Sequence, residues 1–158
     1  MRNPVGRFVL AYLFGYILFF ILLIVGVKAC GQKYEWKKNM PSAALVFAAG
    51  MFEGAMDHLQ FHYDRPNQFW NPDISWRNKY KGGDPANGKT FAGKYMVWTT
   101  DGWHMMKAGR NVSLFTGFVL HISQTSIKKR WYWCVLEGLG YWTINRVGFN
   151  LTYNLLLR

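Results

Sequence analysis

Acidic residues and cysteines are scarce in this chain, and both shortages limit what it can be. Eight Asp and Glu stand against 19 Lys and Arg among 158 residues, which gives a formal net charge of +11. So basic a balance favours three kinds of partner: nucleic acid, an anionic lipid surface or an acidic protein subunit. The two cysteines, Cys30 and Cys134, are too few for a disulfide framework and lack the spacing of a metal site.

Motifs of well-known enzyme classes are missing as well. The chain has no Ser/His/Asp nucleophile elbow, no CxxC pair and no dinucleotide-binding fingerprint. One short segment, Gly83–Thr90 (GDPANGKT), does match the P-loop pattern GxxxxGK[ST]. A working P-loop needs a buried strand before it and an α/β sheet around it, whereas Asn78–Lys81 (NKYK) lacks the character of a core strand. We therefore expect no nucleotide hydrolysis, although the glycine-rich backbone and Lys89 suit the phosphate of a lipid headgroup.

What the chain does have, near its start, is a long apolar run. Residues Phe8–Val27 (FVLAYLFGYILFFILLIVGV) carry no charge, and as a helix they would span roughly 30 Å, the thickness of a hydrocarbon core. A cleaved signal peptide is the alternative, but its apolar region is normally only about 7–15 residues long. The run therefore predicts a transmembrane helix and favours lipid as the partner over nucleic acid. We expect a membrane protein, with the bacterial cytoplasmic membrane as the first guess.

The rest of the chain predicts more helices around one long loop. The expected elements are helices over 41–63, 95–126 and 131–157 and an interfacial loop over 64–94. Asn39 suits the N-cap of the first of these helices. Within that helix Gly50 and Gly54 form a GxxxG pair, which favours close packing against the transmembrane helix. The expected fold class is all-α: a single membrane domain over 1–158, built as a small integral membrane bundle of about four helices.

Histidine is also scarce, and three of the four histidines lie where they could meet. His58 and His62 are four residues apart on one helix face, the spacing that lets two imidazoles reach one metal ion. Asp101 and His104 share a face in the same way near the start of the next helix. Because these helices should run antiparallel through the long loop, we expect both pairs at one membrane face. His121 lies about 25 Å further along, so we expect it to be packed or hydrogen-bonded elsewhere.

Three imidazoles and a carboxylate suit a divalent transition metal, and zinc is the metal that we expect. With water in an open position, such an ion makes a hydrolase, because it lowers the pKa of that water. Asp57 is the candidate general base, and Glu53 is expected to meet a Lys or Arg of another helix. The ligand set is similar in chemistry to that of the progestin-receptor and alkaline-ceramidase superfamily, membrane hydrolases with three His and an Asp at zinc. Those proteins have seven helices and different ligand spacing, so the likeness is one of chemistry only.

Two functions follow from these residues. The first is a membrane-embedded, metal-dependent hydrolase of a lipid or lipid-linked phosphate, in which Arg77, Lys79 and Lys89 hold the anionic headgroup. The second is a non-catalytic accessory subunit of a larger membrane assembly, beside other subunits or copies of itself. In that case the histidines at the helix ends only form hydrogen bonds.

Charged residues within the last two helices support a third function, a small transporter or channel component. Lys107, Arg110, Glu137 and Arg146 interrupt otherwise apolar stretches, and charges at membrane depth are usually paired or functional. We expect Lys107 and Arg110 to snorkel toward water. Glu137 is expected to pair with a basic residue of a neighbouring helix.

Overall fold

The computed structural model describes residues 36–124 and 131–157. Over these ranges the chain is helical, and its one β-type pairing is an isolated antiparallel bridge between Tyr80 and Lys89. The prediction of an all-α fold is therefore confirmed for the described part of the chain. The predicted transmembrane helix over Phe8–Val27 lies outside the described residues. None of the described helices is both long enough and apolar enough to cross a bilayer.

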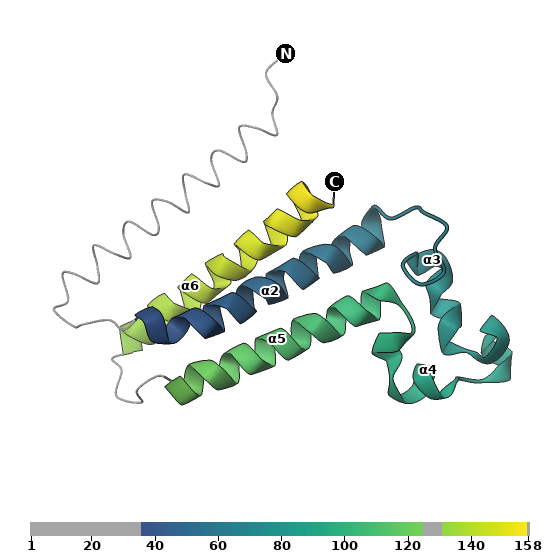
Figure 1. The fold of residues 1–158 in the computed structure, drawn as a ribbon, viewed down its shortest axis with the longest axis horizontal. Helices are drawn as coiled ribbons and strands as arrows, with labels where there is room; N and C mark the ends of the chain where they lie inside the picture. Colours follow the sequence, from purple (N-terminus) through teal and green to yellow (C-terminus); the bar gives the residue numbers. More distant parts are fainter. Residues whose placement is uncertain (1–35, 125–130, 158) are drawn as a thin grey trace, which may run out of the picture.

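Three long helices form one layer, with α2 in the middle (Figure 1). Their bounds are Trp36–Phe61 for α2, Gly102–Gln124 for α5 and Trp131–Asn150 for α6. Helix α5 runs antiparallel to α2, since Gly109 faces Phe52 whereas Gly117 faces Leu45. Helix α6 runs parallel to α2: Asn39 contacts Glu137 near one end of the pair, and His62 contacts Tyr153 near the other.

Glycines set the distance between α2 and α6. A Cβ atom at Gly50 would overlap the Asn145 carbonyl, and one at Gly148 would overlap the Phe47 carbonyl. Gly54 likewise packs on the backbone of Phe149. The Gly50/Gly54 pair therefore does permit close helix packing, but in the described part of the chain its partner is α6, not the transmembrane helix that the sequence suggested.

The predicted helix bounds need three corrections. Helix α2 begins before Asn39, whose buried amide donates to Glu137 Oε1 at 3.0 Å instead of acting as an N-cap. Helix α5 begins only at Gly102, because the side chain of Asp101 caps it. The last helix changes at Leu151–Leu156 into a π-helical segment, η5.

The predicted loop over 64–94 folds as part of a small lobe, which we define as residues 62–101. Figure 1 shows the lobe beyond the ends of α2 and α5 where these two helices are joined. Its short helices are α3 (Pro72–Ser75), η1 (Trp76–Lys79), η2 (Lys81–Gly83), η3 (Pro85–Asn87), α4 (Phe91–Tyr95) and η4 (Val97–Thr99). The Gly102 amide donates to the Phe69 carbonyl at 2.8 Å, and Trp70 lies on Gly102. These contacts hold the lobe against the start of α5.

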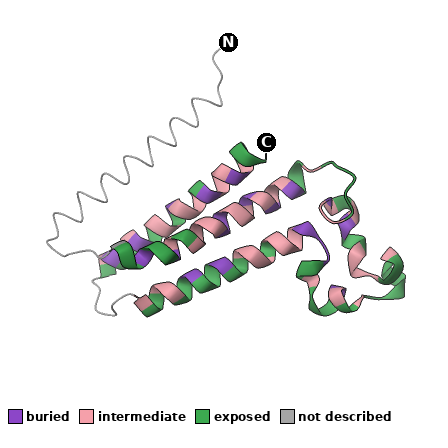
Figure 2. Ribbon diagram, viewed as in Figure 1, coloured by how far each residue is buried: buried purple, intermediate pink, exposed green. Residues whose placement is uncertain are grey.

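Figure 2 shows that the long helices have few buried positions and many exposed ones. Many of the buried residues are polar, and many of the exposed ones are large and apolar. Only four hydrophobic residues of the described chain are buried: Ala49, Met56, Leu59 and Trp133. Where α5 faces α2, its buried residues are Ser113 and Gly117, with Gly102 at its start. Many large apolar side chains of the two outer helices are exposed, with Trp133 of α6 as a buried exception: Val112, Phe115, Phe118, Ile122, Trp131, Val135, Leu139 and Trp142.

Candidate functional site

His58 and His62 form a pair at the end of α2 that joins the lobe. Their ring centroids are 5.9 Å apart, and the rings are tilted by 43°. The Tyr153 hydroxyl lies 2.6 Å from His62 Nε2, within hydrogen-bonding distance. Partial burial and the neighbouring His62 both lower the pKa of His58 below its usual value. Both effects favour the neutral form of His58, which can bind a metal or accept a proton.

This pair borders an open cavity of about 680 Å³. Apolar side chains make one part of its wall, namely Ala55, Leu59, Trp70, Met106, Leu156 and Leu157. Beside the histidines, the polar part is made by Tyr63, Asp64 and Arg65 at the start of the lobe. A wall of this mixed kind suits a small ligand that has both polar and apolar parts.

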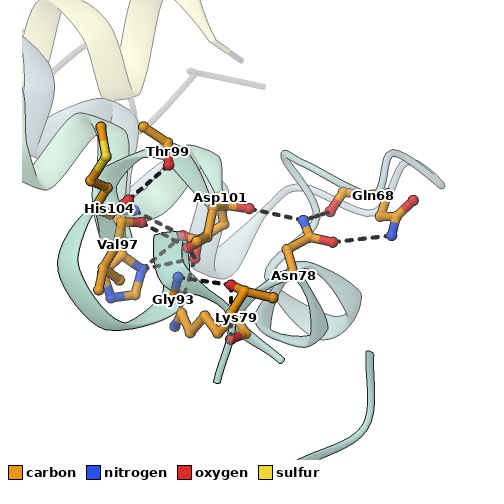
Figure 3. Close-up of polar contacts among 11 residues, drawn as sticks. Gln68, Asn78, Lys79, Gly93, Val97, Thr99, Asp101 and His104 are labelled. Carbon is orange, nitrogen blue, oxygen red and sulfur yellow. Dashed lines mark hydrogen bonds and ion pairs between the residues drawn. The ribbon is translucent and has the colours of Figure 1, made fainter. Parts of the chain in front are cut away.

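Asp101 and His104 form the second pair, at the junction of the lobe and α5 (Figure 3). Asp101 is buried, with 2% of the residue exposed. His104 Nδ1 lies 2.8 and 2.9 Å from its two oxygens, and the His104 backbone amide donates to Oδ1 at 2.9 Å. The Thr100 hydroxyl donates to Oδ2 at 3.1 Å, and Lys79 Nζ lies 3.6 Å from the same atom. Because both oxygens are already bonded, this carboxylate acts as a helix cap and an anchor for the lobe.

The structure places both pairs at the lobe end of the layer, but it does not join them into one site. Trp70 and Met106 line the cavity beside His58 and His62, whereas Asp101 and His104 do not. In residues 36–124 and 131–157, no group of three or more His, Cys, Asp or Glu side chains is arranged to hold a metal ion. The predicted four-ligand set is thus separated into two pairs. The sequence indicates a common end, but it does not indicate that the cavity beside His58 and His62 leaves out Asp101 and His104.

Asp57, the predicted general base, belongs to a different group of charges. It shares a stripe of α2 with Glu53, whose Oε2 accepts from Arg146 Nη2 at 2.9 Å. Burial raises the pKa of Asp57, as does the Glu53 charge, while Arg146 and Arg110 act in the opposite direction. The expected pairing of Glu53 with a basic residue of another helix is found. Asp57 faces these charges and is not a wall residue of the histidine cavity.

The three predicted headgroup residues are spread over the lobe. Arg77 is exposed, and its guanidinium lies 5.5 Å from the Trp76 ring centroid. Lys79 is occupied by Asp101. Lys89 is exposed at the bridge to Tyr80, so these residues do not form one anion site around a common point.

The segment resembling a P-loop is a series of tight turns. It begins in η2, and its glycines Gly83 and Gly88 both have positive φ. Helix η1 precedes it, and the helix that follows, α4, has only five residues. Thr90, the last residue of the pattern, caps α4 through its hydroxyl. The residues around the segment therefore provide neither the strand nor the long helix that phosphate binding by a P-loop requires.

A third polar group lies at the opposite end of the layer. Glu137 is 8% exposed, and its Oε2 lies 3.5 Å from His121 Nε2. His121 Nδ1 lies 2.9 Å from the hydroxyl of Tyr141. His121 is thus hydrogen-bonded, as predicted. Glu137 was expected to pair with a basic residue of a neighbouring helix, and His121 of α5 lies beside it. Burial raises the pKa of Tyr141, which keeps its hydroxyl protonated.

Two of these contacts were not predicted from the sequence: the cap of α5 by Asp101 and the contact between Tyr153 and His62. The Thr100-Asp101-Gly102 sequence just before an apolar stretch is an N-cap signal, which would have moved the start of the helix to its observed place. Tyr153 has no such signal, because only the packing of α6 on α2 brings it to His62. Comparison with known proteins gives no further guide, since no family model, curated protein or solved structure matches the chain.

Proposed function

We propose that this chain is a membrane-embedded accessory protein that contributes a lipid-facing helical layer and has no catalytic centre of its own. One observation carries the proposal: apart from the buried Trp133, α5 and α6 expose many of their large apolar side chains and bury small or polar residues. Phe115 is 70% exposed and Trp131 is 77% exposed, while Ser113 and Thr143 are buried. Water would oppose this arrangement, since each such ring gains roughly 1.5–3 kcal/mol on leaving water.

The contacts between the helices of the layer are also of the kind found in lipid. Helices in lipid associate through small residues and interhelical hydrogen bonds, because lipid removes the hydrophobic drive between them. Here the contact of α2 with α6 depends on Gly50, Gly54 and Gly148. The Asn39–Glu137 and Glu53–Arg146 contacts add polar bonds across the same interface. The predicted transmembrane run, Phe8–Val27, would tie α2 to the same membrane.

The accessory role fits the candidate residues better than hydrolysis does. A metal hydrolase needs its ligands and its base around one point. Asp101 caps α5, and Asp57 lies among the charges of Glu53 and Arg146. Asp101 is thus used to hold the fold together, and Asp57 is not a wall residue of the cavity that the histidine pair borders.

Spin labels on the two outer helices test the proposal. We would replace Phe118 or Leu139 by Cys in a Cys30→Ser/Cys134→Ser background and reconstitute the protein in anionic lipid vesicles. We expect both labels to collide more with dissolved oxygen than with a water-soluble nickel complex, because oxygen concentrates in hydrocarbon. The matched control is Asp84→Cys on the lobe, where the nickel complex should dominate.

Two other results would contradict lipid contact. Equal behaviour of all three labels would place the outer helices in water. Protection of the Phe118→Cys and Leu139→Cys labels from both quenchers would mean that protein covers these faces, and crosslinking would then distinguish a second copy from another subunit.

A further inference from the structure

The end of α2 and the end of α6 meet through three side chains that together have the chemistry of a metal site. We propose that His58, His62 and Tyr153 hold one divalent transition-metal ion, which ties these two helix ends together. The inference goes beyond the proposed function and does not depend on it. It also differs from the set predicted from sequence, because Tyr153 takes the place of Asp101 and His104.

The two imidazoles are already close to the required separation. On one tetrahedral zinc, two imidazole centroids lie roughly 5 Å apart, because each Zn–N bond is about 2.0–2.1 Å. The His58 and His62 centroids are 5.9 Å apart. Both side chains come from adjacent turns of one helix, so small rotations about their χ angles are enough to bring them onto one ion.

Tyr153 supplies an oxygen at the right place. Its hydroxyl lies 2.6 Å from His62 Nε2, and the two rings are 5.4 Å apart. The ring also stacks with that of Phe149, at a centroid distance of 5.4 Å and an interplanar angle of 17°. An ion bound by His62 Nε2 and the Tyr153 oxygen would replace their hydrogen bond and release the phenol proton to water.

The helix geometry around Tyr153 differs from that of the rest of α6. Tyr153 lies in η5, where the Leu157 amide donates to the Thr152 carbonyl at 3.1 Å, five residues back. π-Helical segments are rare, and this one follows the last α-helical turn of α6. Here the wider turn presents Tyr153 to α2 at the end of the layer.

The site is accessible and has room for further ligands. His58 and His62 line the 680 Å³ cavity, which opens to solvent between the end of α2 and the lobe. Water from this cavity can complete the coordination of an ion that has two nitrogen ligands and one oxygen ligand. Imidazole suits zinc, copper, iron and nickel, so the ligand class is a borderline divalent cation and not calcium or magnesium.

Metal titration of the full chain tests the proposal. The protein would be purified in detergent without a histidine tag, stripped with a chelator, and titrated with Zn²⁺ and then Cu²⁺. We expect one equivalent per chain, and at least tenfold weaker binding in His58→Ala and in His62→Ala. In electron paramagnetic resonance, bound Cu²⁺ should show two nitrogen ligands in wild type and one in each of these variants. The matched controls, His104→Ala and His121→Ala, should bind like wild type.

Three results would overturn the assignment. Wild type that binds neither ion at micromolar concentration excludes the site. Equal losses in the control variants would mean that binding reflects exposed imidazoles in general. Tyr153→Phe keeps the ring and its stacking, so unchanged affinity and an unchanged copper spectrum in this variant would remove Tyr153 from the ligand set. Far-UV circular dichroism of each variant checks that the helices are intact.

Discussion

The helical layer and the lobe satisfy their polar groups in different ways. In the layer, a few bonds join distant helices, such as Asn39 with Glu137 and Glu53 with Arg146. In the lobe, side-chain amides bind nearby backbone: Asn67 Oδ1 accepts from the amides of Phe69 and Trp70. The lobe can therefore hold its shape in water, while the layer depends on what surrounds its exposed apolar sides.

Helix contact in the layer gives the largest expected effect. We expect Gly148→Ala to destabilise the protein by about 3 kcal/mol, because the added methyl overlaps the Phe47 carbonyl and forces α6 away from α2. The measurement is thermal unfolding in detergent, followed by circular dichroism. Gly138→Ala is the matched control on the same helix, since a Cβ at that position has no described atom within 4 Å apart from its chain neighbours and the nearby backbone of α6 itself. Equal effects of both changes would show that the close approach of α6 to α2 is not required.

Loss of the cap at the junction should separate the two regions. We expect Asp101→Ala to cost about 2 kcal/mol, since the start of α5 loses its cap and Lys79 and His104 lose their partner. Hydrogen exchange should increase in residues 76–101 more than in α6. Asp73→Ala, at an exposed carboxylate of α3, should leave the exchange nearly unchanged. If exchange rises equally in α6, the lobe and the layer unfold as one unit and the comparison fails.

The ion pair of the layer should give the smallest effect in detergent. We expect Glu53→Gln to destabilise by about 1 kcal/mol, because both partners are partly exposed and water weakens their attraction. Unfolding of the same variant in lipid vesicles sharpens the comparison, since a less polar surround strengthens the pair and should enlarge the loss. The control is Lys81→Gln, in an exposed part of the lobe. The same small loss in both media would argue against a lipid environment for the layer.

Several features were predictable because they depend on neighbours in the sequence. Helical periodicity located the three long helices, and the Asn-, Pro- and Gly-rich composition located the segment between α2 and α5. The spacing of His58 and His62 placed them on one face, since a helix repeats every 3.6 residues. The pairing of Glu53 with a basic side chain followed from its position away from the histidines. The helix bounds were less accurate, as the late start of α5 at Gly102 shows.

The candidate site itself was only half predictable. The sequence indicates that Asp101 and His104 lie at the same end as His58 and His62, but it does not indicate that the cap of α5 uses the Asp101 carboxylate. It also gives no reason to place Tyr153 beside His62, because the two are 91 residues apart. Their contact depends on the parallel course of α6 and on the π-helical turn at its end.

The sequence by itself determined the helical character of this protein, its basic charge and the pairs of residues that share a helix face, because these are set by composition and by local periodicity. Only the tertiary structure decided that α2 lies between α5 and α6, that glycines bring α6 close to α2, and that polar side chains face inward. It also decided which residues surround each histidine. These properties depend on contacts between segments far apart in the chain, where the balance of packing and desolvation selects the partner and no local pattern records it.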